Sequence, residues 1–311
     1  MSFTSTPRVA ILPSATDEIA GAVVEGGGSV VDIAEADSLV WTDPRKPHEL
    51  AEALESSDVE WVQLPFAGIE SFFDAGVIDP NLTWTCAKGI YGPACAEHAV
   101  ALMLAAARRI HVHARMKSWS QLGLDSPEYR LEDRTVVVVG TGGIGASLVP
   151  MVVPLGMRVI GVNRSGHALE GAERTVVVGQ LDGVLAEADF VVVAAAHTDA
   201  THHLFDEGRL AAMKSNAWIV NVARGGLIDT DALVAALEAE AIGGAAVDVT
   251  DPEPLPDGHP LWNLENCLIT PHIANTWAMG LAELPHLVRR NVAARAAGEQ
   301  LEGLVDPELG Y

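Results

Sequence analysis

Three side chains, Arg224, Glu253 and His272, could together act on a 2-keto or 2-hydroxy acid. An arginine can hold a carboxylate through two parallel hydrogen bonds, and a histidine can exchange a proton near neutral pH. A glutamate can hold and tune that histidine, and Glu253 stands between Pro252 and Pro254, which fix its direction. Taken alone, Arg224 could be a surface charge and His272 a core histidine. Their occurrence together favours hydride transfer to or from such an acid.

A glycine-rich turn at residues 140–145 predicts a dinucleotide-binding site. A β-branched run precedes the turn, and a helix and a second strand are expected after it. In such a turn Gly140 permits a tight reversal, and Gly142 lets a pyrophosphate approach the backbone. Gly145 lets the following helix pack closely on the sheet.

The residues about 20 positions after this turn bear on the choice of nucleotide. NAD-binding enzymes carry an acid there that accepts hydrogen bonds from the ribose 2′-hydroxyl. This sequence has Asn163, Arg164 and Ser165 instead. Asn163 removes the repulsion of a 2′-phosphate, Arg164 can stack on adenine and hold that phosphate, and Ser165 can donate one more hydrogen bond. We therefore expect a preference for NADP(H), with NAD(H) open as a second cofactor.

These segments, in this order and spacing, resemble the D-isomer-specific 2-hydroxyacid dehydrogenase family. That family includes glyoxylate and hydroxypyruvate reductases and phosphoglycerate dehydrogenases. Further matches are residues 63–70 (QLPFAGIE), residues 96–98 (AEH), Val305-Asp306 and Gly310-Tyr311. The resemblance therefore covers nearly the whole chain.

The resemblance implies a role for each member of the trio. Arg224 would bind the carboxylate and carbonyl oxygen of the substrate, and His272 would protonate that oxygen as the hydride arrives. Glu253 would favour the protonated histidine and set its tautomer, and Asp248 would contact the nicotinamide carboxamide.

The resemblance also implies further contacts. The substrate would meet the backbone of a carboxylate-binding loop, namely Ala67, Gly68 and Ile69. Tyr91 and Trp277 depart from the usual family pattern, because they add aromatic bulk near the expected substrate site, and interdomain packing is their alternative role. The other cofactor contacts would be Gly143, Ile144, Ala196, His197, Thr201, Val222 and Ala223. Most relatives have Pro-Leu-Thr where this chain has Ala196-His197-Thr198, so the details of that cofactor contact stay open.

Alternating strand-like and helix-like segments predict the α/β fold class. Strands are expected at residues 8–12, 60–64, 83–86, 135–139, 158–162, 190–194, 218–222, 245–249 and 268–270. Helices are expected at residues 16–25, 48–56, 94–116, 146–155 and 231–241. The resemblance adds a helix at 277–297 and implies two Rossmann-like or flavodoxin-like parallel-sheet domains with a cleft between them. A dinucleotide-binding domain, residues 97–283, would be inserted into a substrate domain of residues 1–96 and 284–311.

Composition agrees with an enzyme of this size, because 311 residues that are 49% hydrophobic can form the cores of two domains. The net charge of −23 argues against nucleic acid or an anionic membrane as a partner. No apolar run approaches the roughly 20 residues of a membrane span, and no signal-peptide pattern opens the chain, so we expect a cytoplasmic protein. The three cysteines and the paired histidines lack metal-ligand spacing, and no metal is expected. The nearly all-apolar run 96–107 favours a homodimer.

The favoured function is interconversion of small 2-keto acids and D-2-hydroxy acids with NAD(P)(H), and glyoxylate or hydroxypyruvate is the favoured keto acid. A phosphite or phosphoglycerate dehydrogenase of the same fold is an alternative. Glu253 argues against a formate dehydrogenase, because the formate enzymes of this family replace that glutamate. A non-catalytic, dinucleotide-sensing scaffold is the third alternative.

Overall fold

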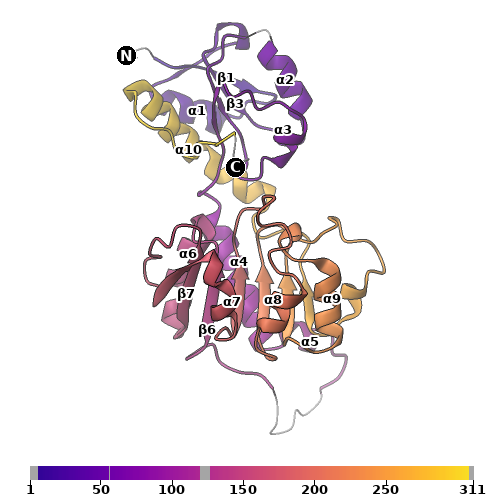
Figure 1. Cartoon of the computed structure of the whole chain (residues 1–311). Helices are drawn as coiled ribbons and strands as arrows, with labels where there is room; N and C mark the ends of the chain where they lie inside the picture. Colours follow the sequence, from indigo (N-terminus) through magenta and orange to yellow (C-terminus); the bar gives the residue numbers. More distant parts are fainter. Residues whose placement is uncertain (1–5, 56, 120–126, 308–311) are drawn as a thin grey trace. The chain divides into compact units, whose positions relative to one another are not determined.

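A computed structural model describes residues 6–55, 57–119 and 127–307 of the chain. The chain divides into two compact units, drawn in Figure 1. Unit 1 comprises Met1–Tyr91 and Thr276–Tyr311, and unit 2 comprises Gly92–Asn275. The domain boundaries expected at 97 and 283 stay a prediction. The motif residues Gly310-Tyr311 lie outside the described residues.

Unit 1 is built on a five-stranded sheet in the order β2-β1-β3-β4-β5, in which all neighbouring strands are parallel. This is the flavodoxin-like strand order. The strands are β1 (Arg8–Leu12), β2 (Ser29–Val30), β3 (Ser38–Trp41), β4 (Trp61–Gln63) and β5 (Thr83–Thr85). The helices are α1 (Asp17–Glu25), η1 (Ile33–Glu35), α2 (Pro47–Glu55), α3 (Glu70–Asp74) and α10 (Trp277–Ala297).

Helices pack on both faces of this sheet (Figure 1). On one face Val9 of β1 packs in a cluster with Val288 of α10. On the other face Leu39 of β3 belongs to a cluster with Leu50 of α2 and Phe72 of α3. Residues from both ends of the chain therefore share one core.

Helix α10 has the bounds that the family resemblance implied for it. It begins after Thr276, whose side chain accepts a hydrogen bond from the N–H of Met279. It ends at Gly298, which adopts φ 69° and so permits the left-handed turn that closes many helices.

Unit 2 contains a seven-stranded, all-parallel sheet in the order β12-β11-β10-β9-β6-β7-β8. Counted from β6, this is the Rossmann order, in which the chain changes direction across the sheet between β6 and β9. The strands are β6 (Thr135–Val139), β7 (Arg158–Asn163), β8 (Arg174–Val177), β9 (Phe190–Val193), β10 (Trp218–Asn221), β11 (Gly244–Val247) and β12 (Cys267–Ile269). The α-helices are α4 (Gly92–Ala107), α5 (Ile110–His113), α6 (Gly143–Val152), α7 (Leu181–Leu185), α8 (Glu207–Ala212) and α9 (Thr230–Glu238). The 3-10 helices are η2 (Val153–Leu155), η3 (Val178–Gln180), η4 (Gly225–Leu227) and η5 (Pro260–Asn263).

Strand β6 shows why this sheet needs helices on both faces. Side chains alternate along a strand, and all five residues of β6 are buried. Val136 and Val138 pack in the cluster that includes α4 and α6, whereas Val137 and Val139 pack in the cluster that includes α7, α8 and α9. Together with unit 1, this arrangement confirms the expected α/β fold with two parallel sheets.

The prediction of one long helix at residues 94–116 is wrong. Helix α4 ends at Ala107, and Arg109 has a left-handed backbone with φ 48° before the short helix α5 begins. The N–H of Tyr129 donates to the carbonyl of Ala107 at 3.0 Å, so a tertiary contact takes the acceptor that a continuing helix would use.

Helix α6 begins at Gly143, earlier than the start expected at 146, because the last part of the glycine turn is itself helical. Strand β3 has no counterpart among the expected strands. All four of its residues are buried, so it lacks the polar alternation that marks a half-exposed strand.

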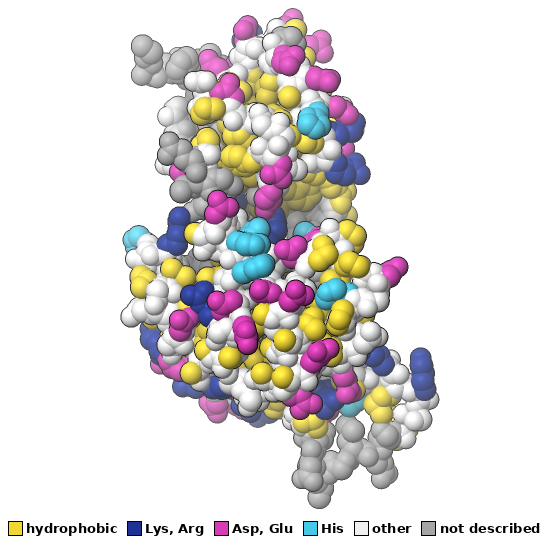
Figure 2. Space-filling model, turned by 45° about the vertical axis from the view of Figure 1, so that its right-hand side comes forward, with side chains coloured by type: hydrophobic (Ala, Val, Ile, Leu, Met, Phe, Trp, Pro, Cys, Tyr) yellow, Lys and Arg dark blue, Asp and Glu magenta, His cyan; other side chains and the backbone are white. Residues whose placement is uncertain are grey.

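None of the helices in the described part of the chain is long and apolar enough to span a membrane. Acidic side chains are scattered over the face shown in Figure 2, in keeping with 42 Asp and Glu against 19 Lys and Arg.

Candidate active site

The carboxyl ends of strands β10, β11 and β12 carry the catalytic candidates to one edge of the sheet in unit 2. These strands are parallel neighbours, and Arg224 follows β10, Glu253 follows β11 and His272 follows β12. The first two loops also touch, since a Cβ added to Gly225 would lie 2.0 Å from the backbone of Thr250. The fold therefore places the trio at one edge of one sheet.

His272 and Glu253 form a direct pair. His272 Nδ1 lies 2.5 Å from Glu253 Oε1, and the two side chains are 49% and 39% exposed. An ionised carboxylate can only accept, so Nδ1 carries the proton of this bond. His272 Nε2 is then the nitrogen left to face a substrate.

The backbone of His272 is unusual, because its φ is 51°. A residue with a Cβ pays roughly 1–2 kcal/mol for this left-handed conformation. The N–H of His272 donates to the carbonyl of Asp248 at 2.7 Å, and this bond ties the loop to the end of β11. The angle of the imidazole is thus set by its neighbours rather than by local preference.

The carboxylate of Asp248 holds the same loop, which we call the histidine loop (residues 270–274). One oxygen, Oδ1, accepts from Thr270 Oγ1 at 2.6 Å and from the N–H of Ile273 at 2.9 Å. The other oxygen accepts from the N–H of Ala274 at 2.9 Å. The side chain is only 1% exposed. The expected contact of Asp248 with a carboxamide stays a prediction.

Asp248 is ionised despite its burial. Burial alone would raise its pKa, but the hydrogen bonds from His98, Thr270 and the two loop N–H groups lower the pKa to about 2. His98 takes part because its Nε2 lies 3.0 Å from Thr270 Oγ1 and 3.4 Å from Asp248 Oδ1. The sequence named His98 only as part of a family motif. Its signal in the sequence was a polar residue that, apart from the exposed Glu97, stands alone in an apolar helix.

Arg224 lies half-buried at the end of β10. Its Nη1 donates to the carbonyl of Ala223 at 2.7 Å, and the buried side chain of Asn221 donates to the carbonyl of Arg224 at 2.9 Å. Val222 and Ala223 are buried beside this turn. The backbone on both sides of the guanidinium is therefore fixed.

The glycine turn fits a dinucleotide. Gly140 has φ 101°, and a Cβ there would lie 2.4 Å from the carbonyl oxygen of Ala194. A Cβ on Gly145 would lie 2.3 Å from the carbonyl oxygen of Gly140. Gly142 differs, because a Cβ there would meet nothing within 4 Å. The backbone at Gly142 is thus open to a ligand where Gly143 and Ile144 begin α6, and helix N-termini favour phosphate groups.

Asn163 ties the loop after β7 to the glycine turn. Its Nδ2 donates to Thr141 Oγ1 at 2.8 Å and to the carbonyl of His167 at 2.9 Å, and its Oδ1 accepts from the N–H of Gly166 at 2.6 Å. Ser165 Oγ lies 2.7 Å from His167 Nδ1, and Arg164 is exposed on this loop. The choice of nucleotide by these residues stays a prediction.

The segment after β9 is ordered by Thr201, whose hydroxyl donates to the carbonyl of Ala196 at 2.7 Å and accepts from the N–H of Thr198 at 2.8 Å. His197 Nε2 lies 3.2 Å from His202 Nδ1. A Cβ on Gly226 would lie 2.8 Å from His197 Nε2, so this segment packs against the turn that follows Arg224.

The expected substrate-binding residues other than Arg224 and His272 belong to unit 1. Ala67, Gly68 and Ile69 follow β4, in a loop that an aromatic cluster supports. The ring of Phe66 lies 5.5 Å from that of Tyr91 and 5.4 Å from that of Trp277, centroid to centroid. The Tyr91 hydroxyl donates to the carbonyl of Pro65. Tyr91 is 7% exposed and Trp277 is 43% exposed, so Trp277 offers more surface to a ligand.

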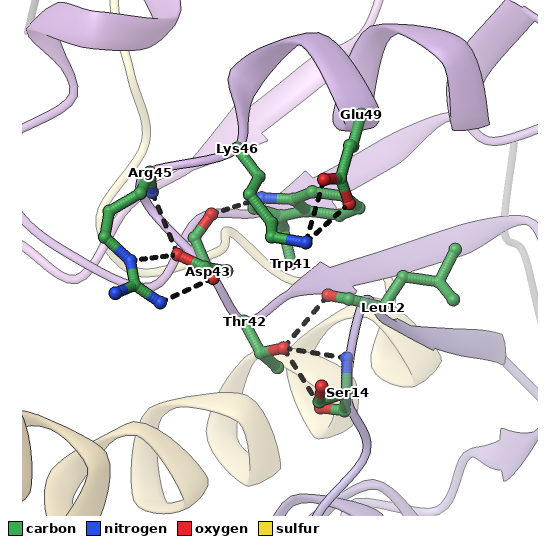
Figure 3. Close-up of polar contacts among 8 residues, drawn as sticks. All are labelled: Leu12, Ser14, Trp41, Thr42, Asp43, Arg45, Lys46 and Glu49. Carbon is green, nitrogen blue, oxygen red and sulfur yellow. Dashed lines mark hydrogen bonds and ion pairs between the residues drawn. The ribbon is translucent and has the colours of Figure 1, made fainter.

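The loop after β3 adds a residue that sequence reasoning missed (Figure 3). Arg45 Nε donates to Asp43 Oδ1 at 3.0 Å and Nη2 donates to Oδ2 at 2.9 Å, and these bonds lower the pKa of Asp43. Trp41 Nε1 donates to the carbonyl of Asp43 at 2.6 Å. Arg45 Cζ lies 5.7 Å from the ring centroid of Trp277. Arg45 therefore joins the surroundings of the aromatic cluster.

In the part of the chain that the structure describes, no three His, Cys, Asp or Glu side chains are arranged to hold a metal ion. Burial raises the pKa of Cys95 to about 11 and that of Cys267 to about 12. Both thiols are therefore protonated at neutral pH.

Comparison with known proteins adds to this geometry. The family profile described as D-isomer specific 2-hydroxyacid dehydrogenase, NAD binding domain, matches residues 100–274. A protein of Corynebacterium melassecola, described as an uncharacterized protein in the proB 3′ region, is 42% identical over 299 residues, which cover 93% of this chain and 95% of that protein. The glyoxylate reductase of Thermofilum pendens is 34% identical over 234 residues, which cover 72% of this chain and 68% of the reductase.

Solved structures agree. The D-isomer specific 2-hydroxyacid dehydrogenase of Xanthobacter autotrophicus Py2, solved in complex with NADPH and MES, aligns with a TM-score of 0.83 at 27% identity. The alignment covers 99% of this chain and 100% of that one. The resemblance inferred from the motifs is confirmed: the chain belongs to the D-isomer-specific 2-hydroxyacid dehydrogenase family and is an NAD(P)-dependent oxidoreductase.

Proposed function

We propose that the protein reduces small 2-keto acids to D-2-hydroxy acids, that it prefers NADPH, and that glyoxylate or hydroxypyruvate is its substrate. The observation that carries the proposal is the pair of His272 Nδ1 and Glu253 Oε1 at 2.5 Å, on the same sheet edge as Arg224. A proton donor and a carboxylate-binding cation on one edge are the two groups that reduction of a keto acid requires.

Arg224 would bind the carboxylate. Its guanidinium offers several donors in a fixed plane, which matches a carboxylate with two parallel bonds. The bonds around Ala223 and Asn221 fix its backbone, so the substrate would meet a pre-organised group rather than a mobile one.

His272 would supply the proton. The protonated imidazole donates from Nδ1 to Glu253 and from Nε2 to the keto oxygen of the substrate. A bound reduced nicotinamide cofactor supplies the hydride. After the proton has moved to the substrate oxygen, neutral His272 keeps its Nδ1–H bond to Glu253, so the ring does not turn between steps.

Two observations support the choice of NADPH. At the end of β7, Asn163, Arg164 and Ser165 occupy the positions where NAD-binding enzymes carry an acid, so these positions lack the carboxylate that would repel a 2′-phosphate. The Xanthobacter relative was solved with NADPH. Glyoxylate as substrate is supported by the reductase from Thermofilum pendens.

The test is a panel of glyoxylate, hydroxypyruvate and pyruvate, each assayed with NADPH and NADH by loss of absorbance of the reduced cofactor. We expect turnover with a higher kcat/KM for NADPH. Arg224→Lys should lower kcat/KM about 10- to 150-fold, the loss of one charge-assisted hydrogen bond, because an ammonium cannot reproduce the planar fork. Arg158→Lys is the matched control, since Arg158 is exposed at the opposite end of the strands, and it should behave as wild-type. A best substrate without a carboxylate would contradict the proposal.

We also propose a homodimer. Around the end of α4 and the segment after it, four large apolar side chains are exposed, namely Leu104, Ile110, Met116 and Trp119. Exposed apolar surface of this kind marks association sites. Light scattering at micromolar concentration should give twice the 32.7 kDa of one chain, and a mass of one chain would contradict the dimer.

A further inference from the structure

Helix α4 is almost wholly apolar, yet it carries His98, whose side chain is only 18% exposed. A polar group that leaves water is costly unless a hydrogen bond replaces the water. His98 finds that bond at the carboxyl edge of the sheet, where its Nε2 lies 3.0 Å from Thr270 Oγ1. The side chain of His98 therefore contacts the histidine loop through a hydrogen bond.

The bonds around Thr270 have a fixed direction. The carboxylate of Asp248 can only accept, so the single hydroxyl proton of Thr270 is donated to it across 2.6 Å. Thr270 Oγ1 is then an acceptor toward His98, and His98 Nε2 must be the donor. The same nitrogen lies 3.4 Å from Asp248 Oδ1, so the imidazole of His98 is close to the carboxylate as well as to the hydroxyl.

Asp248 holds the loop that carries His272. Asp248 accepts from the N–H groups of Ile273 and Ala274 and also receives, at its carbonyl, the N–H of His272. The left-handed φ of 51° at His272 persists only if neighbouring bonds over-determine it. A shift of the Asp248 side chain would therefore change the position of the His272 imidazole.

We propose that His98 is a positioning residue for His272, acting through Thr270 and Asp248 from a helix far away in the sequence. The inference rests on the proposed function, in which His272 transfers the proton. His98 touches neither substrate nor cofactor in this scheme. Its task is to donate one hydrogen bond that keeps the histidine loop in its shape.

The kinetic test compares two variants of one residue. His98→Leu removes the donor at similar volume, and we expect kcat to fall about 10- to 100-fold, because misplacement of a catalytic group by about 1 Å costs on this order. KM for the keto acid and Kd for NADPH should stay within about threefold, since Arg224 and the glycine turn are untouched. His98→Gln places a donor at the position of Nε2 and should restore most of kcat.

The matched control is His111, a half-buried histidine in α5 at the other end of the sheet. Its Nε2 lies 3.1 Å from the carbonyl of Glu265, before β12, and its ring packs edge-on to Trp218 at 5.6 Å. His111→Leu should lower thermal stability as His98→Leu does, but leave kcat unchanged. Equal losses of kcat in His98→Leu and His111→Leu would show a general stability effect and overturn the proposal.

A second readout needs no substrate. In unliganded protein labelled with ¹³C at histidine Cε1, the signal of His272 is assigned by its absence in His272→Gln. It should move in His98→Leu and return toward its wild-type position in His98→Gln. A His272 signal unmoved in His98→Leu would refute the positioning role even if no keto acid were turned over, whereas a moved signal without any turnover would refute the proposed function alone.

A double-mutant cycle completes the test. Thr270→Val removes the hydroxyl that joins His98 to Asp248. In that background His98→Leu should cost less than about threefold in kcat, since the bond is already broken. Additive losses would place His98 outside the path to His272.

Discussion

The glycine turn after β6 and the histidine loop after β12 lie at the same edge of one sheet, but different interactions fix their conformations. The turn keeps its shape because side chains are missing, since a Cβ on Gly140 would collide with the backbone of Ala194. The loop keeps its shape because the buried carboxylate of Asp248 gathers hydrogen bonds from several segments. One site is therefore shaped by sterics and the other by electrostatics.

A Cβ added at Gly140 tests the steric explanation for the shape of the glycine turn. Gly140→Ala should lower the free energy of unfolding by roughly 2–5 kcal/mol, because φ 101° and a contact of 2.4 Å with a carbonyl oxygen both penalise a Cβ. Gly142→Ala is the matched control, since a Cβ there meets nothing. It should unfold like wild-type and yet bind NADPH more weakly. Urea unfolding and cofactor titration of both variants decide this, and a wild-type unfolding curve for Gly140→Ala would contradict the steric account.

The next effect tests the chemistry of the loop. His272→Ala should lower kcat about 100-fold or more while NADPH affinity stays near wild-type, because the proton donor is lost and the glycine turn is intact. In Glu253→Gln, the rate of reduction should begin to fall at a lower pH than in wild-type, since a neutral amide offers the imidazolium no opposite charge. Steady-state rates of both variants between pH 5 and pH 9 measure these effects. If the pH dependence of Glu253→Gln equals that of wild-type, Glu253 does not act on His272.

A third prediction concerns the edge of the cofactor site. Arg164→Ala should weaken NADPH by about 1.5–3 kcal/mol and NADH far less, if the guanidinium holds the 2′-phosphate. Calorimetric titration with both cofactors gives the difference. Equal weakening of both, or a wild-type preference for NADH, would contradict the assignment.

The fourth prediction concerns the contribution of the Asp248 carboxylate to the stability of the fold. The folded pKa of Asp248 is about 2 against an ordinary 3.8, so its ionisation stabilises the fold above about pH 4 and this stability is lost as the pH falls from 4 toward 2. The shift corresponds to about 2 kcal/mol. We therefore measure the free energy of unfolding by denaturant at pH 2.5 and at pH 6. In Asp248→Asn, the part of the loss of stability at pH 2.5 that comes from protonation of Asp248 should be absent. Asp257→Asn, which changes an exposed carboxylate, should keep the wild-type limb.

The contrast also explains what the sequence could predict. The glycine turn and β6 are contiguous, and β6 has the predicted bounds of residues 135–139. The network around Asp248 joins residues 98, 248 and 270–274, and no local pattern shows that three distant segments meet. The break at Arg109 was missed for the same reason, because the N–H of Tyr129 that ends α4 comes from far along the chain. The hydrogen bonds of Asn163 to Thr141 and Gly166 were likewise not predicted, because the position of Asn163 in the sequence indicated only a role in the choice of cofactor.

We propose that the sheet edge with Arg224, Glu253 and His272 directs hydride and proton to one face of a 2-keto acid. The most direct test is chiral chromatography of the glycerate formed from hydroxypyruvate, with the NADPH consumed in the same incubation measured by absorbance. We expect D-glycerate alone, in an amount equal to the NADPH oxidised. L-Glycerate or a racemic product would contradict this expectation.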